Sequence, residues 1–282
     1  MENSFSVDSG GVTLKGKYFR PRGRELQEKK PQGKGMFRAL VLCHGIPGGR
    51  GPQSSLSGAG TYQELAAWFR EAGFFSFTFN FRGTGESGGN FDLREWAGDL
   101  QAVLGYLESF PEIGEVNLVG FSGGAAAALH HVAEAREDKG GAAGSREDQG
   151  ARKIGSLVLA ACPADTGFLV NRDNLEEVIA RLKSTGIIRE AGFPPDPLEW
   201  LKKALTVQPE RDIPRVAPCP VLILHGTGDE LIPPEHARRL YRAAREPKEL
   251  KLVEGAGHRL RKDKRVAQLI LDWLQGLQAP QG

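Results

Sequence analysis

Short apolar runs alternate along this chain with longer stretches of helical period, and this alternation limits the folds open to it. The apolar runs are rich in residues that favour β-strands, and they lie at 11–19, 39–45, 74–81, 115–120, 155–161, 220–226 and 249–255. Helical patterns lie at 62–72, 93–110, 234–245 and 264–277, and in the alanine-rich run after Ser122. This arrangement is typical of an α/β protein with a mostly parallel central sheet and helices on both faces. Such sheets bind ligands beyond the carboxyl ends of their strands.

A serine lies at one of the points where a strand pattern gives way to a helical pattern. Ser122 stands between Gly120 and Gly124 in GFSGG, which has the form G-x-S-x-G. In this motif the serine occupies the tip of a tight strand-to-helix turn, in a strained conformation that leaves no room for bulky neighbours. Both glycines meet that demand, so Ser122 is predicted to be a nucleophile. A structural turn is the alternative interpretation of so short a pattern.

A serine nucleophile needs a general base and a carboxylate that orients the base. Two later strand ends offer these groups, because Asp229 follows the 220–226 run and His258 follows the 249–255 run. Neighbouring parallel strands bring their carboxyl-end loops together, so we expect both side chains to meet Ser122 at one edge of the sheet. Asp165 follows the 155–161 run and is a second candidate for the carboxylate.

The chain has other histidines that compete with His258 for the role of base. His130 and His131 are adjacent in a helical pattern, where their side chains point about 100° apart, so they do not easily share a metal ion. His236 stands near the start of a helical pattern and is expected to be exposed. His258 therefore remains the best candidate for the base.

Five motifs together resemble those of the α/β-hydrolase superfamily. They are HGIPGG at 44–49, FRGTGESGG at 81–89, GFSGG at 120–124, HGTGDELIPPEH at 225–236 and GAGH at 255–258. The chain order Ser122, Asp229, His258 matches the order of nucleophile, acid and base in that fold. The resemblance runs from about residue 5 to residue 277. Asn80 departs from it, because similar chains carry an aspartate there, and we expect this change to affect the packing of a turn.

The resemblance also implies an oxyanion hole, a pair of backbone N–H groups that bind the negative oxygen formed when the serine attacks a carbonyl. The residue after the first His-Gly pair and the residue after the nucleophile supply these groups in the family. In this chain they are Ile46 and Gly123. The same resemblance implies that His44 and His225, which begin the two His-Gly pairs, shape loops rather than transfer protons.

Residues 163–217 carry apolar side chains without a strong strand pattern, and we interpret them as a small helical cap inserted between two parts of the core, 1–162 and 218–282. One set of apolar residues repeats at the spacing of a helix face and is expected to seat the cap on the core: Leu175, Val178, Ile179 and Leu182. The candidates for contact with an acyl group lie outside this stripe: Phe168, Leu169, Phe193 and Trp200.

A dinucleotide-binding module is a remote alternative, because residues 83–88 fit G-x-G-x-x-G after a strand pattern. Glu86 would place a carboxylate beside the pyrophosphate, and the helical pattern begins only near Asp92, beyond the glycines that should open it. No P-loop pattern and no zinc-ligand spacing occurs in the sequence. We therefore predict no cofactor and no metal.

The net charge of the chain indicates which partners it can bind, and its cysteines indicate the cellular compartment. The formal net charge of the 282 residues is +2 with both signs interspersed, which gives no electrostatic case for nucleic acid or a membrane surface. No apolar run approaches the ~18 residues of a membrane span. Three cysteines, without C-x-x-C spacing, adjoin apolar runs and favour a reducing cytoplasm. Nothing in the sequence indicates an oligomeric state.

Two charged segments need separate interpretations. Residues 136–153 are charged and glycine-rich, and we interpret them as a mobile surface loop rather than a site. The basic run at 259–265 begins beside His258. It is either the solvated start of the last helix or a surface that attracts an anionic substrate.

These features predict a serine hydrolase that cleaves a carboxylic ester of a small or medium acyl group through an acyl-enzyme. In this mechanism Ser122 attacks the carbonyl, His258 accepts its proton and passes it to the leaving group, and Asp229 orients the imidazole. An aminopeptidase-like serine peptidase, a thioesterase or an acyltransferase would use the same residues, because fold and triad do not determine the acyl or leaving group. A hydrolase fold kept for binding would be marked by loss of one of these residues, and none is lost.

Overall fold

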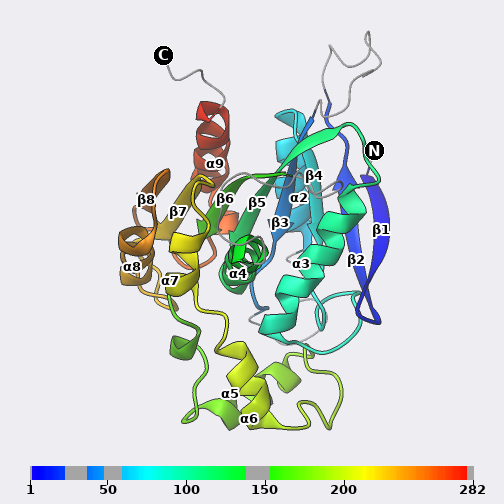
Figure 1. Ribbon diagram of the computed structural model, residues 1–282, viewed down its shortest axis with the longest axis vertical. Helices are drawn as coiled ribbons and strands as arrows, with labels where there is room; N and C mark the ends of the chain where they lie inside the picture. The colour runs from blue at the N-terminus through cyan, green and yellow to red at the C-terminus, as the bar shows by residue number, and fades with distance from the viewer. Residues whose placement is uncertain (1, 23–36, 48–58, 138–152, 278–282) are drawn as a thin grey trace.

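The central element of the fold is an eight-stranded sheet in the order β1-β2-β4-β3-β5-β6-β7-β8 (Figure 1). The computed structural model describes residues 2–22, 37–47, 59–137 and 153–277. The strands are β1 (Glu2–Ser9), β2 (Val12–Phe19), β3 (Phe37–Cys43), β4 (Phe75–Phe79), β5 (Ile113–Phe121), β6 (Lys153–Ala160), β7 (Val221–Gly226) and β8 (Lys248–Val253). β2 pairs antiparallel with β1 and with β4, and the pairs from β4 to β8 are parallel. The predicted mostly parallel sheet is thus confirmed.

Helices cover both faces of this sheet, as the sequence predicts (Figure 1). One face packs against α2 (Ala59–Glu71) and α9 (Lys264–Gly276), and the other against α3 (Leu93–Leu107), α4 (Gly123–Glu137) and α8 (Glu235–Ala243). Because successive side chains of a strand point to opposite faces, Val41 packs with the α3 and α4 side while its neighbours Leu40 and Leu42 pack with α2 and α9. All three are fully buried, which explains the continuous apolar runs.

The strand order places the carboxyl ends of β3 and β5 side by side. From β3 the chain turns through α2 to β4 on one side, and through α3 it then crosses back to β5 on the other side. A parallel sheet opens a crevice where its connections diverge in this way, and ligands bind there. Ser122 follows β5 and Ile46 lies in the loop after β3, so both stand at this point.

The strand pattern of the sequence does not predict β1. Its burial alternates, but the polar Asn3 and Ser9 share the inward face with Phe5 and Val7, so the apolar signal is only two residues. Phe5 stacks on Tyr106 of α3 with ring centroids 4.6 Å apart. That contact and the pairing with β2 hold the strand at the edge of the sheet, and neither is visible in local sequence.

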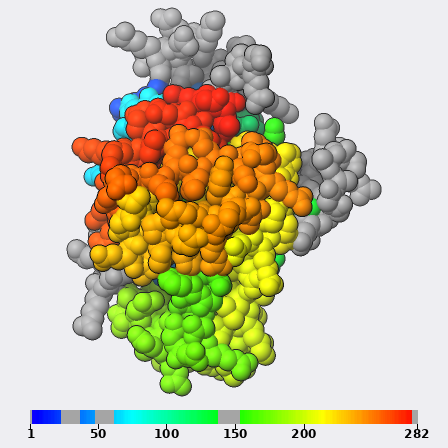
Figure 2. Space-filling model, turned by 90° about the vertical axis from the view of Figure 1, so that its left-hand side faces the viewer, coloured from blue at the N-terminus to red at the C-terminus, as the bar shows by residue number. Residues whose placement is uncertain are grey.

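Between β6 and β7 the chain forms short helices rather than strands: η1 (Thr166–Phe168), α5 (Leu175–Ser184), α6 (Pro197–Ala204), α7 (Pro209–Asp212) and η2 (Ile213–Arg215). Figure 1 shows α5 and α6 beyond the end of the sheet. Figure 2 shows that the green and yellow parts of the chain, which include these helices, protrude below the orange part. Asp196 begins α6 by accepting the N–H groups of Leu198 and Glu199 at 3.0 and 3.1 Å.

The three cysteines Cys43, Cys162 and Cys219 are buried free thiols, and burial raises the pKa of each. Among the described residues, no helix is long and apolar enough to cross a membrane. The segment 136–153, interpreted from the sequence as a surface loop, falls mostly on 138–152, which lie outside the described residues.

Candidate active site

Ser122 occupies the turn between β5 and α4 in a left-handed conformation, with a φ of 52°. Such a backbone is costly for a residue with a side chain, and it persists only where its surroundings impose it. A Cβ atom on Gly120 would lie 2.4 Å from Cα of Ala125, and one on Gly124 would lie 2.2 Å from the carbonyl oxygen of His44. Backbone therefore passes too close for any larger residue at the two glycines, which is the steric demand that the sequence motif predicts.

His258 lies between Ser122 and Asp229. Its Nε2 is 3.1 Å from Oγ of Ser122, and its Nδ1 is 2.9 Å from Oδ2 of Asp229. The structure thus brings together the three side chains from the ends of β5, β7 and β8. Asp165 is not among them, because its carboxylate accepts the N–H of Gly167 at 2.8 Å and begins η1.

The Asp229 carboxylate is inaccessible to solvent and surrounded by donors. Its Oδ1 accepts the N–H groups of Leu231 and Ile232 at 3.0 and 2.9 Å. Burial by itself would raise the pKa of Asp229, but hydrogen bonds from His225, His258 and the Ile232 amide outweigh it and hold the pKa below its usual range. An ionised Asp229 accepts the Nδ1–H of His258, so the lone pair on Nε2 faces the Ser122 hydroxyl.

His225, at the end of β7, contacts the same carboxylate. Its Nε2 donates to the carbonyl oxygen of Ile232 at 2.8 Å and lies 3.2 Å from Oδ2 of Asp229. The sequence resemblance implies that His225 shapes a loop. The structure adds that the loop is the one carrying Asp229, a contact that strand-end spacing alone does not reveal.

Ile46 and Gly123 are neighbours beside Ser122. A Cβ atom on Gly123 would lie 2.8 Å from Cγ1 of Ile46 and 3.7 Å from its backbone nitrogen. The loop after β3 and the start of α4 therefore bring the two expected oxyanion-hole residues together. The backbone of α4 begins here, and the positive end of a helix dipole favours a developing negative charge.

His44 holds the loop that carries Ile46. Its Nδ1 donates to the carbonyl oxygen of Gly45 at 2.8 Å, and its Nε2 accepts the N–H of Phe81 at 3.1 Å. Burial lowers the pKa of His44 to about 4, so the ring is neutral near pH 7 and its Nε2 can accept a hydrogen bond. The Gly45 N–H donates to the Tyr62 hydroxyl at 3.3 Å, which ties the loop to α2.

A cavity of about 830 Å³ opens in front of Ser122 and His258. Of the four residues predicted to contact an acyl group, Leu169 and Trp200 line this cavity, whereas Phe168 and Phe193 are not among its lining residues. Phe168 is 47% exposed and packs on the ring of His236, with centroids 4.6 Å apart.

The stripe expected to seat the cap divides between two roles. Leu175, Ile179 and Leu182 are buried in the main hydrophobic cluster, and Val178 packs against it. Val178 and Leu182, on the same helix α5, also line the cavity beside Ser122. The helix face is wide enough to pack against the core on one side and to line the cavity on the other. The spacing of apolar residues in the sequence does not show which residues have which role.

The remaining histidines have structural partners. Nδ1 of His130 is 2.8 Å from Oδ2 of the buried Asp212. The expectation that His236 is exposed is wrong, because only 6% of the residue is accessible and its Nδ1 accepts the N–H of Ala164 at 3.1 Å. The segment after β6 folds over the start of α8 and covers it. Within the described ranges, no three metal-ligand side chains converge.

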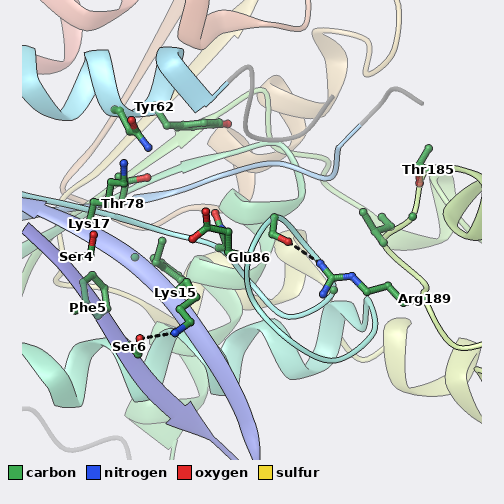
Figure 3. A pocket seen from close by; sticks show the side chains of 18 of the residues that line it. Ser4, Phe5, Ser6, Lys15, Lys17, Tyr62, Thr78, Glu86, Thr185 and Arg189 are labelled. Carbon is green, nitrogen blue, oxygen red and sulfur yellow. Dashed lines mark hydrogen bonds between the residues drawn. The ribbon is translucent and has the colours of Figure 1, made fainter. Parts of the chain in front are cut away.

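A second cavity, of about 870 Å³ (Figure 3), shares Tyr62, Ser184 and Thr185 with the first. The four cations of the described chain that line it have partners: Nζ of Lys15 lies 2.9 Å from the Ser6 hydroxyl, Lys17 pairs with Glu2, and Lys183 and Arg189 donate to backbone carbonyls. Residues 83–88, which fit the dinucleotide motif, form a closed turn here. The N–H of Gly83 donates to the carbonyl oxygen of Gly88 at 2.8 Å. α3 begins five residues later, at Leu93, so these glycines do not open a helix.

Comparisons with known proteins agree with this architecture. The model of the alpha/beta hydrolase family matches residues 40–269. The chain is 26% identical over 200 residues to the uncharacterized protein YfhR of Salmonella typhi. The matched region covers 69% of this chain and 58% of YfhR. The chain thus spans less than two thirds of the length of this curated relative.

Solved structures show the same fold at low identity. Est1E from Butyrivibrio proteoclasticus with ferulic acid bound has a TM-score of 0.63 and 17% identity, covering 97% of this chain and 98% of that one. The esterase domain of a Rhodothermus marinus protein has a TM-score of 0.61 and 16% identity, and the match covers 98% of this chain and 97% of that domain. With the family model matched over most of its length, this chain belongs to the alpha/beta hydrolase family.

Proposed function

We propose that this protein is a serine hydrolase that cleaves a carboxylic ester of a small or medium acyl group. The observation that carries the proposal is the run of hydrogen bonds from Ser122 through His258 to Asp229, with distances of 3.1 and 2.9 Å, at the wall of a cavity of about 830 Å³. Nucleophile, base and orienting carboxylate are the minimum set for acyl transfer to a serine.

In the first half of the reaction, Oγ of Ser122 attacks the ester carbonyl while Nε2 of His258 takes the hydroxyl proton. The carbonyl oxygen becomes negative and binds the N–H groups of Ile46 and Gly123. The imidazolium, stabilised by Asp229, then gives its proton to the leaving alcohol, and the acyl-enzyme remains. In the second half, water attacks the acyl group, His258 takes the water proton and returns a proton to Oγ, and the carboxylic acid leaves.

The choice of an ester with a modest acyl group rests on the cavity. Its apolar lining includes Leu169, Val178, Leu182 and Trp200, which suit a hydrocarbon chain. We assign these residues to a cap formed by 163–217 over a core of 1–162 and 218–282. The neighbouring folds include one named as an esterase domain, which supports the same class. The buried free thiols support a cytoplasmic location.

The nucleophile is tested with a fluorophosphonate probe. We expect a single covalent label on Ser122, because hydrogen bonding to His258, which can take the hydroxyl proton, raises the nucleophilicity of this serine above that of other serines. The label is mapped by mass spectrometry of the digested protein, and Ser122→Ala is the control. Labelling that persists in Ser122→Ala would remove the basis of the proposal.

The leaving group is tested with a panel of three kinds of substrate. They are acetyl and butyryl 4-nitrophenyl esters, acetyl and butyryl thioesters, and aminoacyl 4-nitroanilides. We expect the highest kcat/KM for the esters, and loss of all turnover in Ser122→Ala. Preference for a thioester or an amide would instead favour a thioesterase or a peptidase. Product that appears only with an added alcohol or amine would favour an acyltransferase.

A further inference from the structure

Four cationic side chains line the cavity beside Ser122: Arg181, Arg259, Arg261 and Lys262. In the described part of the chain, no aspartate or glutamate lines this cavity, because Asp229 lies behind His258. Several like charges along a concave wall of low dielectric produce a field that concentrates ions of the opposite sign. The cavity of a neutral substrate has no need of such a field.

Several cations on the neighbouring helices α6 and α8 are neutralised by carboxylates. Lys202 pairs with Glu199, Arg239 with Glu210, and Arg242 with Glu235. None of the four cavity cations forms an ion pair with another described residue. Their charges are therefore available to a ligand.

The basic run at 259–265 is divided between two roles in the structure. At its end, Asp263 caps the start of α9 and pairs with Arg265 at 2.6 Å, as expected for a solvated helix start. At its beginning, Arg259 and the η3 turn (Leu260–Lys262) face the cavity. The first part of the run therefore belongs to the wall of the cavity, next to His258.

Arg261 lines the same cavity as Ser122 and contacts the loop that carries Ile46 through Tyr62. Its guanidinium carbon is 5.2 Å from the centre of the Tyr62 ring, whose hydroxyl accepts the N–H of Gly45, the residue before Ile46. Burial is the main cause of the low pKa of His44, and the charge of Arg261 lowers that pKa further, so its field reaches this loop. The buried Nε of Arg261 has no hydrogen-bond partner among the described residues.

We propose that the substrate carries an anionic group, a carboxylate or a phosphate, within a few bonds of the scissile ester, and that Arg259, Arg261 and Lys262 bind it. This inference rests on the proposed function, since it names the class of ester that the same site accepts. A guanidinium binds two oxygens of a carboxylate or a phosphate through paired N–H groups. Arg181, on the facing helix α5, adds to the same field.

The test compares matched charged and neutral esters. For a charge on the acyl side, the pair is the mono-4-nitrophenyl ester of glutaric acid and 4-nitrophenyl valerate. For a charge on the leaving group, the pair is 4-acetoxybenzoate and 4-acetoxybenzamide. We expect kcat/KM to be about tenfold higher for the anionic member of at least one pair, and this preference to fall as salt screens the charges.

Substitutions then assign the preference to the cavity wall. Arg259→Gln and Lys262→Gln change exposed side chains, and each is expected to lower the ratio of anionic to neutral kcat/KM several-fold, with Arg261→Gln lowering it further. Lys264→Gln is the control, because this exposed cation of the same run does not line the cavity and should leave the ratio unchanged. Thermal unfolding of each variant verifies that the fold is retained.

Binding without turnover separates the two proposals. Ser122→Ala is titrated calorimetrically with monomethyl glutarate and with phenyl phosphate, and the titrations are repeated with Arg259→Gln and Lys262→Gln added. If no ester is hydrolysed but an anion binds and needs these cations, the hydrolase proposal fails and the anion site stands. If neutral esters are hydrolysed as well as charged ones and the substitutions leave the ratio unaltered, the anionic substrate is refuted and the hydrolase stands.

Discussion

Asp229 and Asp165 are both aspartates that follow parallel strands, and their surroundings separate them. Asp229 is a buried carboxylate that His258 and two backbone N–H groups approach. Asp165 accepts one backbone N–H at the start of η1. A buried charge is tolerated only where donors satisfy it, so the donor set around Asp229 keeps it ionised and available to orient His258.

Asp229→Asn is expected to lower kcat by about 10⁴, because the amide no longer favours the tautomer of His258 with a free Nε2. Asp165→Asn is the matched control and is expected to lower kcat far less. Both are measured by steady-state kinetics on the best ester of the panel, after circular dichroism has shown native folding. A larger loss in Asp165→Asn would place the acid after β6 instead of β7.

At the scale of the element, α5 both packs against the core and lines the cavity beside Ser122. Its buried Leu175 and Ile179 contact the hydrophobic cluster, while the half-buried Val178 faces the cavity. The η1 turn places Leu169 at the cavity, whereas its neighbour Phe168 packs on His236 outside the cavity and is partly exposed to solvent. These two adjacent residues offer a test of the cap in which only one of them should affect substrate choice.

We expect Leu169→Ala and Val178→Ala to reduce kcat/KM for octanoyl esters more than for acetyl esters. Each methylene of the acyl chain that is no longer buried loses about 0.8 kcal/mol of binding free energy. This lowers the ratio of octanoyl to acetyl kcat/KM about fourfold. Phe168→Ala, which removes an exposed ring outside the cavity, should leave the ratio unchanged. The chain-length series from acetyl to octanoyl measures this, and an unchanged preference in both cavity variants would mean that the cap does not form the acyl site.

At the scale of the whole molecule, two buried imidazoles make stability depend on pH. Burial lowers the pKa of His44 and of His131 from 6.5 to about 4. His44 supports the loop after β3, and His131 lies in α4 and hydrogen-bonds to the backbone of Ala97 in α3. Protonation of either ring would place a charge inside the protein, between elements that hold the site in position.

In both cases the unfolded chain binds a proton at a higher pH than the folded protein does. The free energy of unfolding is therefore expected to fall as the pH drops from about 6.5 to about 4, by about 1.4 kcal/mol per pH unit for each ring. The free energy of unfolding continues to fall below the ordinary pKa of an aspartate. This is because the pKa of Asp229 is lower in the folded protein than in the unfolded chain, so the unfolded chain binds the proton first. Urea unfolding across this range measures the slope.

His131→Gln is the control for this dependence, since an amide can still donate a hydrogen bond but does not titrate. Its slope is expected to be smaller than that of the parent by about 1.4 kcal/mol per pH unit between the same limits, because His44 and His236, whose pKa values are also lowered by burial, still take up protons on unfolding. An equal slope in the parent and the variant would show that other groups carry the acid sensitivity.

The sheet, its covering helices and the family are determined by features that can be read locally in the sequence. Apolar runs and helical periods reflect burial along single elements, and the strand-end positions of Ser122, Asp229 and His258 bring them together in any parallel sheet with this connection order. β1 has only a weak local signal, because its place depends on contacts of Phe5 with Phe77 and Tyr106 and on pairing with β2.

Only the tertiary structure decides what a side chain between elements faces. Leu169 and Trp200 line the cavity while Phe168 and Phe193 do not, although all four are large and apolar. His236 is buried by a segment more than sixty residues earlier in the chain. The basic run divides between cavity wall and helix start within a few residues. In each case the outcome depends on how distant segments pack, and local hydropathy carries no record of that packing.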